Sequence, residues 1–298
     1  MSSSVGKAVA ERVPPFWLPL ERIQMAPCGN GRPWVFWSAN EKGNFDLWAR
    51  VVESGKPGIT VRLSSAPGSD IDPAATTDSS GKIWVAWQGW RNGKASIFTS
   101  VQNGNAFSEA ATTASSAGNE WNPAIAADST GKVSVAWDSY RNGNYDIFAR
   151  TATGPGKWGK EVAVAATEFY EAYPSIAYDP AGTLWIAYEE GGARWGKDFG
   201  ADESSGVALY AGRAIRLRGL SKDGRIVEAA ADPGTVLPGV PAGPDDAATQ
   251  SQESDWRRPD LEAWKKRGAN LATASPAYAR RGPRNTMARL RIDASGRL

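Results

Sequence analysis

A ten-residue segment recurs four times along this chain, and each copy begins 50 or 51 residues after the one before it. The copies are CGNGRPWVFW (28–37), DSSGKIWVAW (78–87), DSTGKVSVAW (128–137) and DPAGTLWIAY (179–188). A period of about 20 to 50 residues is typical of proteins built from repeated structural units. The repeat therefore limits the chain to folds in which similar units pack side by side.

Each copy is typical of a tight turn followed by a short strand. In the last three copies Asp comes first and Gly follows three residues later, at Gly81, Gly131 and Gly182. Asp accepts hydrogen bonds within its own turn, and Gly adopts the left-handed backbone conformation that such a turn requires. The residues after the Gly are largely apolar, which predicts a strand that is covered on both faces.

Two columns of the aligned copies predict how the units pack. One column is mostly small and the next is large and aromatic: Phe36, Ala86, Ala136 and Ala187, then Trp37, Trp87, Trp137 and Tyr188. Successive strand residues point to opposite faces, so the small face of one sheet can receive the aromatic face of the next. We predict an all-β fold, a β-propeller of four-stranded blades. A two-sheet sandwich is the alternative, although it requires no internal repetition.

A second turn recurs at the same period and supports the same unit. It lies in NEKGNFDLWAR (40–50), WRNGKASIFTS (90–100) and YRNGNYDIFAR (140–150). Two of the three copies contain Asn-Gly, which is a strong signal for a short hairpin. We therefore expect the third strand of each unit to begin near Phe45, Ser96 and Tyr145.

The repeats divide the chain into four parts. We expect an irregular lead-in over 1–19, four blades over 20–231, an insertion rich in Pro, Gly and basic residues over 232–285, and the first strand of a further blade over 286–298. The last of these contains ARLRIDASGRL, which matches the segment that enters the repeated turn. Four blades and the start of a fifth predict an incomplete ring, so we expect a longer parent protein whose remaining blades or downstream domain are its partners.

Composition excludes several classes of site. Histidine is absent and Cys28 is the one cysteine, so His-based triads, histidine metal sites and internal disulfides are ruled out, and no cofactor or metal is predicted. The net charge of +2 gives no general attraction to nucleic acid, and the basic segment 256–298 has no accompanying RNA-binding motif. No apolar run is long enough to span a membrane, and the N-terminal segment lacks the apolar core of a secretory signal.

Charged and aromatic residues gather on the loops of one predicted face. The loops that enter each first strand carry Asp70, Glu120 and Glu171 three residues before a Pro, and the loops of the other set carry Arg91 and Arg141. Trp121 and Tyr173 lie in the same loops and offer a stacking surface for a sugar or a peptide, and an insertion adds Arg194 and Trp195. These nine residues are the candidate ligand-binding set.

A purely structural role for the same charges is an open alternative. Acid–arginine pairs between neighbouring blades would satisfy these groups without any ligand and would set the register of the blades. Glu189 and Glu190 are adjacent on a strand, so their side chains are expected on opposite faces, which makes the two of them poor candidates for a two-carboxylate hydrolytic site.

The repeats resemble those of bacterial propellers. The overall pattern is similar to propellers of the Tol–Pal type, and DSSGKIW and DPAGTLW are similar to two-component-regulator repeats. The turns also resemble the Asp box of sialidases, which places Gly two residues after Asp rather than three. YRNGNYDIFAR (140–150), GTLWIAYEEGGARWGKDFG (182–200) and ALYAGR (208–213) resemble the propeller that precedes a PHP-like hydrolase-type domain in large bacterial proteins. This resemblance implies catalysis outside the chain and a periplasmic or extracellular location, while the residues leave the compartment open.

Two functions follow as hypotheses. The first is a non-catalytic binding or scaffold module that recognises a glycan, peptide or protein partner on its loop face. The alternative is a carbohydrate-active enzyme of sialidase or polysaccharide-lyase type that uses Tyr, Glu and Arg from the same face. A purely structural spacer is a third possibility.

Overall fold

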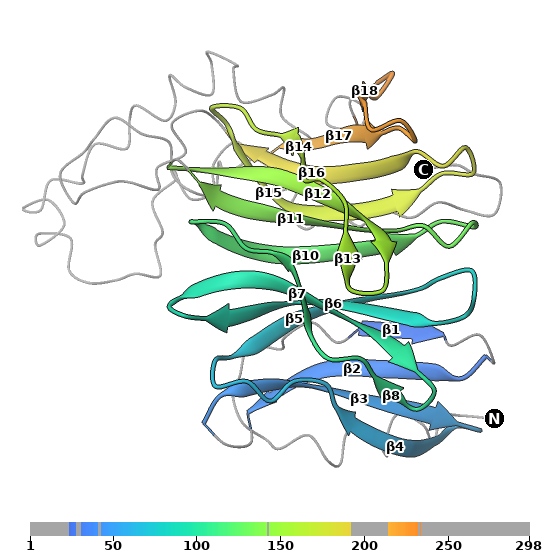
Figure 1. Ribbon diagram of the computed structural model, residues 1–298. Coiled ribbons are helices and arrows are strands. Elements are labelled where there is room, and N and C mark those ends of the chain that lie inside the picture. The colour runs from blue at the N-terminus through green and yellow to red at the C-terminus, as the bar shows by residue number, and fades with distance from the viewer. Residues whose placement is uncertain are drawn as a thin grey trace, which may run out of the picture.

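The computed structural model describes residues 24–27, 31–40, 43–141, 143–191 and 214–231, together with Pro233. These residues form four antiparallel sheets that follow one another in chain order (Figure 1). The first sheet contains β1 (Gln24–Pro27), β2 (Pro33–Asn40), β3 (Phe45–Glu53) and β4 (Lys56–Arg62). The second contains β5 (Asp70–Thr77), β6 (Ile83–Arg91), β7 (Lys94–Asn103), β8 (Ala106–Phe107) and β9 (Ala111–Ala114).

The other two sheets repeat this order. The third contains β10 (Asn119–Ala127), β11 (Val133–Arg141), β12 (Asn144–Gly154), β13 (Lys157–Trp158) and β14 (Val162–Ala165). The fourth contains β15 (Tyr170–Tyr178), β16 (Leu184–Gly191), β17 (Ala214–Leu220) and β18 (Ile226–Glu228). The first strands β1, β5, β10 and β15 lie next to one another in sequence order, as the innermost strands of propeller blades do. The predicted fold is confirmed: the described residues form an incomplete β-propeller of four blades.

The repeated turns have the predicted geometry. Asp128 accepts hydrogen bonds from the backbone N–H of Thr130 and of Lys132, both at 2.8 Å, and Gly131 has φ of 91°. Burial alone would raise the pKa of the Asp128 carboxyl, but these hydrogen bonds, with that of the Thr130 hydroxyl, lower it. The carboxylate is therefore the form that holds the turn.

Aromatic side chains connect each blade to the one before it. Trp87 and Trp137 are completely buried, and they pack in clusters that contain Ala49 and Ala86 of the preceding blade. Phe107 and Trp158, at the edges of blades two and three, also reach back and meet Trp34 and Trp84 edge to face. The predicted packing of aromatic residues on small ones is confirmed, and burial of such rings is the largest apolar contribution that a sheet interface contains.

The innermost strands begin earlier than predicted and contain a bulge. The pairing of β5, β10 and β15 with the next strand shifts between Ile71 and Ala74, and at the equivalent places in β10 and β15. The residue inside each bulge has a left-handed backbone: Asp72, Asn122 and Tyr173, with φ of 52°, 50° and 56°. The strands therefore continue through the Pro to the acidic residues, which become part of the sheet rather than of a free loop.

Several predicted segments lie outside the described residues. These are the lead-in 1–19, the insertion 232–285 apart from Pro233, the predicted further strand 286–298, and the loop with Arg194 and Trp195. Within the described part of the chain, no helix is long and apolar enough to cross a membrane.

Candidate functional site

The three acidic residues of the predicted face occupy equivalent positions in blades two, three and four. Asp70, Glu120 and Glu171 each lie at the start of the innermost strand, and all three are 0% exposed. Their partners across the sheet differ from blade to blade: Gly89, Ser139 and Glu190 respectively. A comparison of the three positions shows which contacts of the acid are shared by the blades and which occur in one blade alone.

In blade two the acid is fully paired. Arg91 Nη2 donates to both carboxylate oxygens of Asp70, at 2.9 and 3.0 Å, and Trp87 Nε1 donates to Oδ1 at 2.8 Å. Burial raises the pKa of Asp70, although Arg91 and the hydrogen bonds oppose that rise. A Cβ on Gly89 would lie 2.5 Å from Asp70 Oδ1, so the sheet has no room for a second side chain there.

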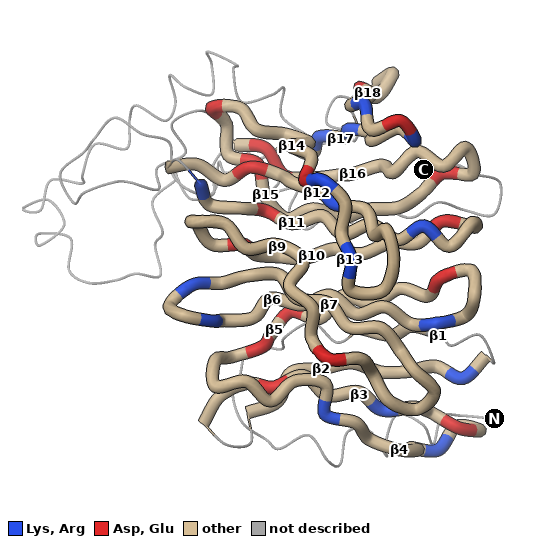
Figure 2. Tube along the Cα trace, viewed as in Figure 1, with Lys and Arg blue, Asp and Glu red and all other residues tan. Residues whose placement is uncertain are grey.

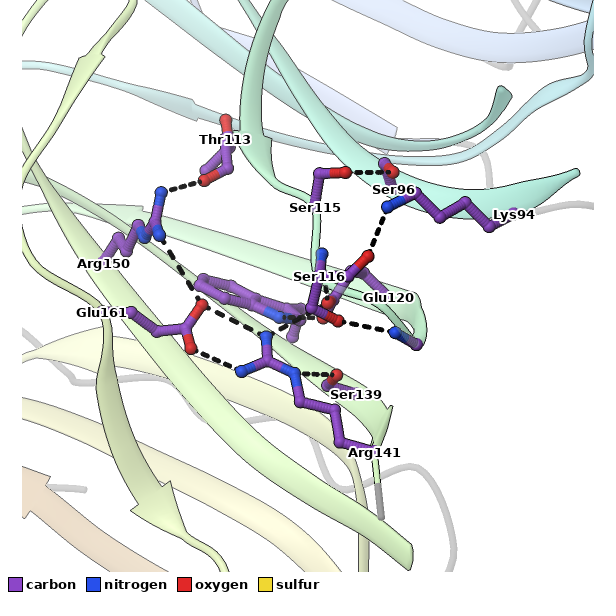
Figure 3. Close-up of polar contacts among 12 residues, drawn as sticks. Lys94, Ser96, Thr113, Ser115, Ser116, Glu120, Ser139, Arg141, Arg150 and Glu161 are labelled. Atoms are coloured by element: carbon purple, nitrogen blue, oxygen red, sulfur yellow. Dashed lines mark hydrogen bonds and ion pairs between the residues drawn. The ribbon is translucent and has the colours of Figure 1, made fainter. Parts of the chain in front are cut away.

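In blade three the same arrangement is extended by a second carboxylate (Figure 3). Trp137 Nε1 donates to Glu120 at 2.6 Å, and Arg141 donates to Glu120 at 3.1 Å and to Glu161 at 2.6 Å. Burial alone would lower the pKa of Arg141, but Glu161 and Glu120 raise it, so the guanidinium stays charged. Buried charges that are paired and hydrogen-bonded in this way set the geometry of a sheet end.

The acid–arginine pairs differ from the expected ones in one respect. We expected pairs between neighbouring blades, whereas Asp70–Arg91 and Glu120–Arg141 both join two adjacent strands of a single blade. The reason is the bulge, which brings the acid beside the end of the next strand. These four side chains satisfy one another, and a ligand-binding role for them stays a prediction.

Blade four keeps the acid but has lost its partners. The sequence has Tyr188 in place of the indole of Trp137, and Gly192 in place of Arg141. Among the described residues, Glu171 accepts hydrogen bonds only from Thr167, from its hydroxyl at 2.5 Å and its backbone N–H at 3.3 Å. Burial raises the pKa of Glu171 to about 7, and the charges of Asp146 and Glu190 add to the rise.

The charges of two other carboxyl groups, Glu190 and Asp146, therefore act on Glu171. Glu190 is the cross-strand partner of Glu171, so the two side chains share one face of the sheet. Asp146 comes from β12 of the preceding blade, and burial raises its pKa to about 6 against the opposing charge of Arg141. Arg216 Nε donates to Glu190 at 2.8 Å. Asp146 and Glu190 are 9% and 8% exposed, so these two of the three residues reach solvent.

Tyrosine rings of blades three and four pack against one another at their junction. The Tyr145 ring centroid lies 4.9 Å from that of Tyr140 and 5.4 Å from that of Tyr170, and Tyr173 packs on the same cluster. Tyr173 also donates its backbone N–H to Asp138 at 3.0 Å. Of the predicted aromatic residues, Tyr173 thus belongs to this tyrosine cluster, whereas Trp121 lies on β10 in blade three.

An open groove lies between blades two and three on the same face. It has a volume of about 550 Å³ and is lined by Gly93, Lys94, Ala117, Gly118, Asn119, Tyr140 and Arg141. Figure 2 shows basic positions at the tip of the β6–β7 hairpin and acidic positions over β15 and β16. The face is therefore basic at the groove and acidic at the neighbouring blade junction.

The sequence interpretation missed Asp146 and rejected Glu190. Adjacent strand residues do alternate in direction, as argued for Glu189 and Glu190, but the second carboxyl beside Glu190 comes from another strand. One signal was available: blade four retains the acid while it replaces both residues that pair with it elsewhere. In the described ranges, no group of three or more acidic or cysteine side chains is placed to hold a metal ion.

No family model and no curated protein matches this sequence. In structure, the chain is similar to a protein of unknown function from Dyadobacter fermentans, with a TM-score of 0.51 and 15% identity over 70% of this chain and 67% of that one. A thermostable family-43 glycoside hydrolase matches with a TM-score of 0.48 and 14% identity over 74% of this chain and 78% of that one. TolB from Acinetobacter baumannii matches with a TM-score of 0.41 and 16% identity over 70% of this chain and 43% of that one.

These comparisons confirm the resemblance to propellers at the level of fold, and they correct the leading functional hypothesis. Several other solved structures of similar fold are enzymes, arabinanases and arabinofuranosidases among them. The prediction of a non-catalytic binding or scaffold module is wrong on this comparison, which agrees better with the alternative of a carbohydrate-active enzyme. At identities this low each likeness concerns the fold, so the activity has to be argued from the residues of this chain.

Proposed function

We propose that this chain is a carbohydrate-active enzyme that cleaves a glycosidic bond at the carboxyl groups of Asp146, Glu171 and Glu190. The observation that carries the proposal is the difference between blades. In blades two and three the acid of the innermost strand is paired with Arg and hydrogen-bonded by Trp, whereas in blade four Glu171 is the cross-strand partner of Glu190 and the charges of Glu190 and Asp146 raise its pKa. A buried acid that has no arginine partner among the described residues and whose pKa other carboxyls raise is an arrangement that proton transfer uses and that stability alone does not require.

Asp146 and Glu190, which keep 9% and 8% of their surface exposed, supply the two roles that glycoside hydrolysis needs. Asp146, with a pKa of about 6, would protonate the departing glycosidic oxygen as the bond from the anomeric carbon breaks. Glu190, which pairs with Arg216, would take a proton from the water that bonds to the same carbon. Glu171 is completely buried, so we assign it as a positioning residue that keeps the pair close and one of the three groups protonated.

The tyrosine cluster supports a sugar as the substrate class. Tyr145 and Tyr173 are only partly buried, and each presents an aromatic ring with a polar hydroxyl. Such rings stack on the apolar face of a sugar ring while the hydroxyl bonds to its rim. The specific repeat types suggested by the motifs, Tol–Pal or two-component-regulator, likewise remain proposals that rest on those motifs.

The test is hydrolysis of a polysaccharide panel that includes arabinan, which several of the fold neighbours are named for, and polygalacturonate. We expect Asp146→Asn and Glu190→Gln each to lower kcat by about 100-fold or more, as loss of general acid–base catalysis does. Glu120→Gln is the matched control, because it alters the equivalent acid of blade three and should leave kcat of the folded protein within about threefold. Equal losses in all three variants would contradict the proposal.

The pH dependence is a second readout. The Asp146 carboxyl must hold its proton to act as the acid, so kcat should fall as the pH rises through about 6. Glu171→Gln removes one ionisable group from the coupled set, and it should move this descending limb while Glu120→Gln leaves it in place. A merely structural Glu171 would lower the amount of folded enzyme without moving the limb.

A further inference from the structure

The groove between blades two and three contains a charge that its structural role does not require. Lys94 occupies the first position of β7, where β12 has Asn144 and the first blade has Asn44. Asn44 donates to the carbonyl oxygens of Ala66 and Gly68, and Asn144 donates to those of Thr167 and Phe169.

Lys94 makes the same kind of contact. Its Nζ donates to the carbonyl oxygen of Ser116, in the segment that leads into the next blade (Figure 3). All three residues thus tie a hairpin to the following connection, and a neutral amide is sufficient in two of the three blades. The positive charge of Lys94 is therefore additional to the connection that it makes.

The other cation of the groove is already neutralised. Arg141 is held by Glu120 and Glu161, whose two charges exceed its own. Arg150 lies 3.7 Å from the second oxygen of Glu161 and balances that excess. Across the residues that the structure describes, Lys94 takes part in no ion pair, and the carbonyl that it contacts carries no net charge. The groove thus has one uncompensated ammonium group at its edge.

We propose that this groove binds an anionic sugar unit, whose carboxylate or sulfate group pairs with Lys94. The inference rests on the proposed function and names its substrate class as an acidic polysaccharide. Tyr140 lines the groove and its ring packs on Tyr145, which in turn meets Tyr170 beside Glu171. One tyrosine cluster therefore connects the groove to the innermost strand of blade four, which carries Glu171. A polysaccharide chain lying across this face would place one unit in the groove and a neighbouring unit at the reaction site.

The experiment is calorimetric titration of the full chain carrying Glu190→Gln, so that binding is measured without turnover. The probes are trigalacturonate, a galactose trisaccharide sulfated at O6, and neutral galactotriose, which has the same ring stereochemistry. We expect an acidic probe to bind at least about tenfold more tightly than the neutral one, the effect of one charge-assisted hydrogen bond. Rising NaCl concentration should weaken the acidic probe selectively.

Three variants separate recognition from structure. Lys94→Asn restores the residue of the other blades, so the melting temperature should stay unchanged while the acidic probe loses its advantage. Lys94→Arg should retain that advantage. Lys160→Asn removes a lysine charge from an exposed position elsewhere and should leave binding unaltered.

Tight binding of the carboxylated or of the sulfated probe supports the proposal and identifies the anion. Equal binding of acidic and neutral probes overturns it, as does an acidic preference that survives Lys94→Asn, or the absence of binding by all three probes. The proposed function is tested separately. Unchanged hydrolysis by Asp146→Asn would contradict the assignment of the reaction site, and it would not affect the binding result for the groove.

Discussion

At the scale of single residues, one buried acid occurs in three environments that the same fold provides. Asp70 and Glu120 are hydrogen-bonded partners of arginine and indole groups, whereas Glu171 faces Glu190 and has a pKa of about 7. Its ordinary value is 4.5. The fold therefore tolerates an unneutralised acid at this position only because that acid can keep its proton.

The stability of Glu171→Gln relative to the native protein should depend on pH in a defined direction. Between pH 4.5 and about 7 the folded chain holds a proton that the unfolded chain has released, so native stability falls as pH rises and levels off above about 7. Gln does not titrate, so its stability lacks this pH dependence. Across this window the free energy of unfolding of the variant should therefore rise by on the order of 2 kcal/mol relative to that of the native protein. Urea denaturation at several pH values measures it.

Glu120→Gln is the control for that measurement. It removes one partner of a buried ion pair and should cost on the order of 3 kcal/mol at neutral pH. A loss of similar size from Glu171→Gln at pH 8 would show that Glu171 is an ionised structural acid, contrary to this account.

At the scale of elements, the turns and paired strands follow from local chemistry that a sequence displays. The Asp and Gly positions, the Asn-Gly hairpins and the alternating apolar residues all predicted the structure they form. The bulges of the innermost strands were not predictable in this way. They depend on the pairing register, which places Glu171 opposite Glu190, and a shift of one residue reverses every side chain beyond it.

The sequence also did not predict that the segment entering a blade lies against the backbone of a neighbouring hairpin. A Cβ added to Gly68 or Gly118 would lie 1.8 or 2.0 Å from the carbonyl oxygen of Trp90 or Tyr140, so each glycine allows the segment entering a blade to touch the hairpin beside it. Neither glycine belongs to the repeated turns, and only the three-dimensional contact explains it.

Gly118→Ala should therefore push the connection away from Tyr140 and reshape the groove that both residues line. We expect a loss of about 2 kcal/mol or more in the free energy of unfolding, because the clash is with backbone. Gly154→Ala is the control, since its Cβ would meet nothing within 4 Å and should change stability by less than about 1 kcal/mol. Chemical denaturation of the two variants is the measurement, and equal stability would refute the close contact.

At the scale of the whole molecule, stability comes from the junctions between blades. The clusters around Trp87, Trp137 and Tyr188 each combine residues of two successive blades. The small and aromatic columns of the repeat predicted these junctions. The candidate site could not be predicted as a whole, because Asp146 and Glu171 come from different blades and only the folded arrangement lets the charge of one raise the pKa of the other.

Trp137→Ala should lower the free energy of unfolding by about 3 to 5 kcal/mol. It leaves a cavity between blades two and three and also removes a hydrogen-bond donor to Glu120. Trp90→Ala removes the same side chain from a position that is 41% exposed, and it should cost less than half as much. Thermal unfolding of both variants compares them. A small effect of Trp137→Ala would mean that the blades hold together by some other contact.

The aromatic side chains of Trp87, Trp137 and Tyr188 all pack against the preceding blade. One side of a blade therefore carries the large aromatic residue, and the other side carries the small residues that receive it. Such a stack has a direction, and its blades cannot be turned over. A gene duplication that copies one complete period, from one innermost strand to the next, would supply a unit whose two sides already fit both neighbours. A duplication of any other length would add a blade with missing strands, so copying whole periods is the route that preserves these junctions.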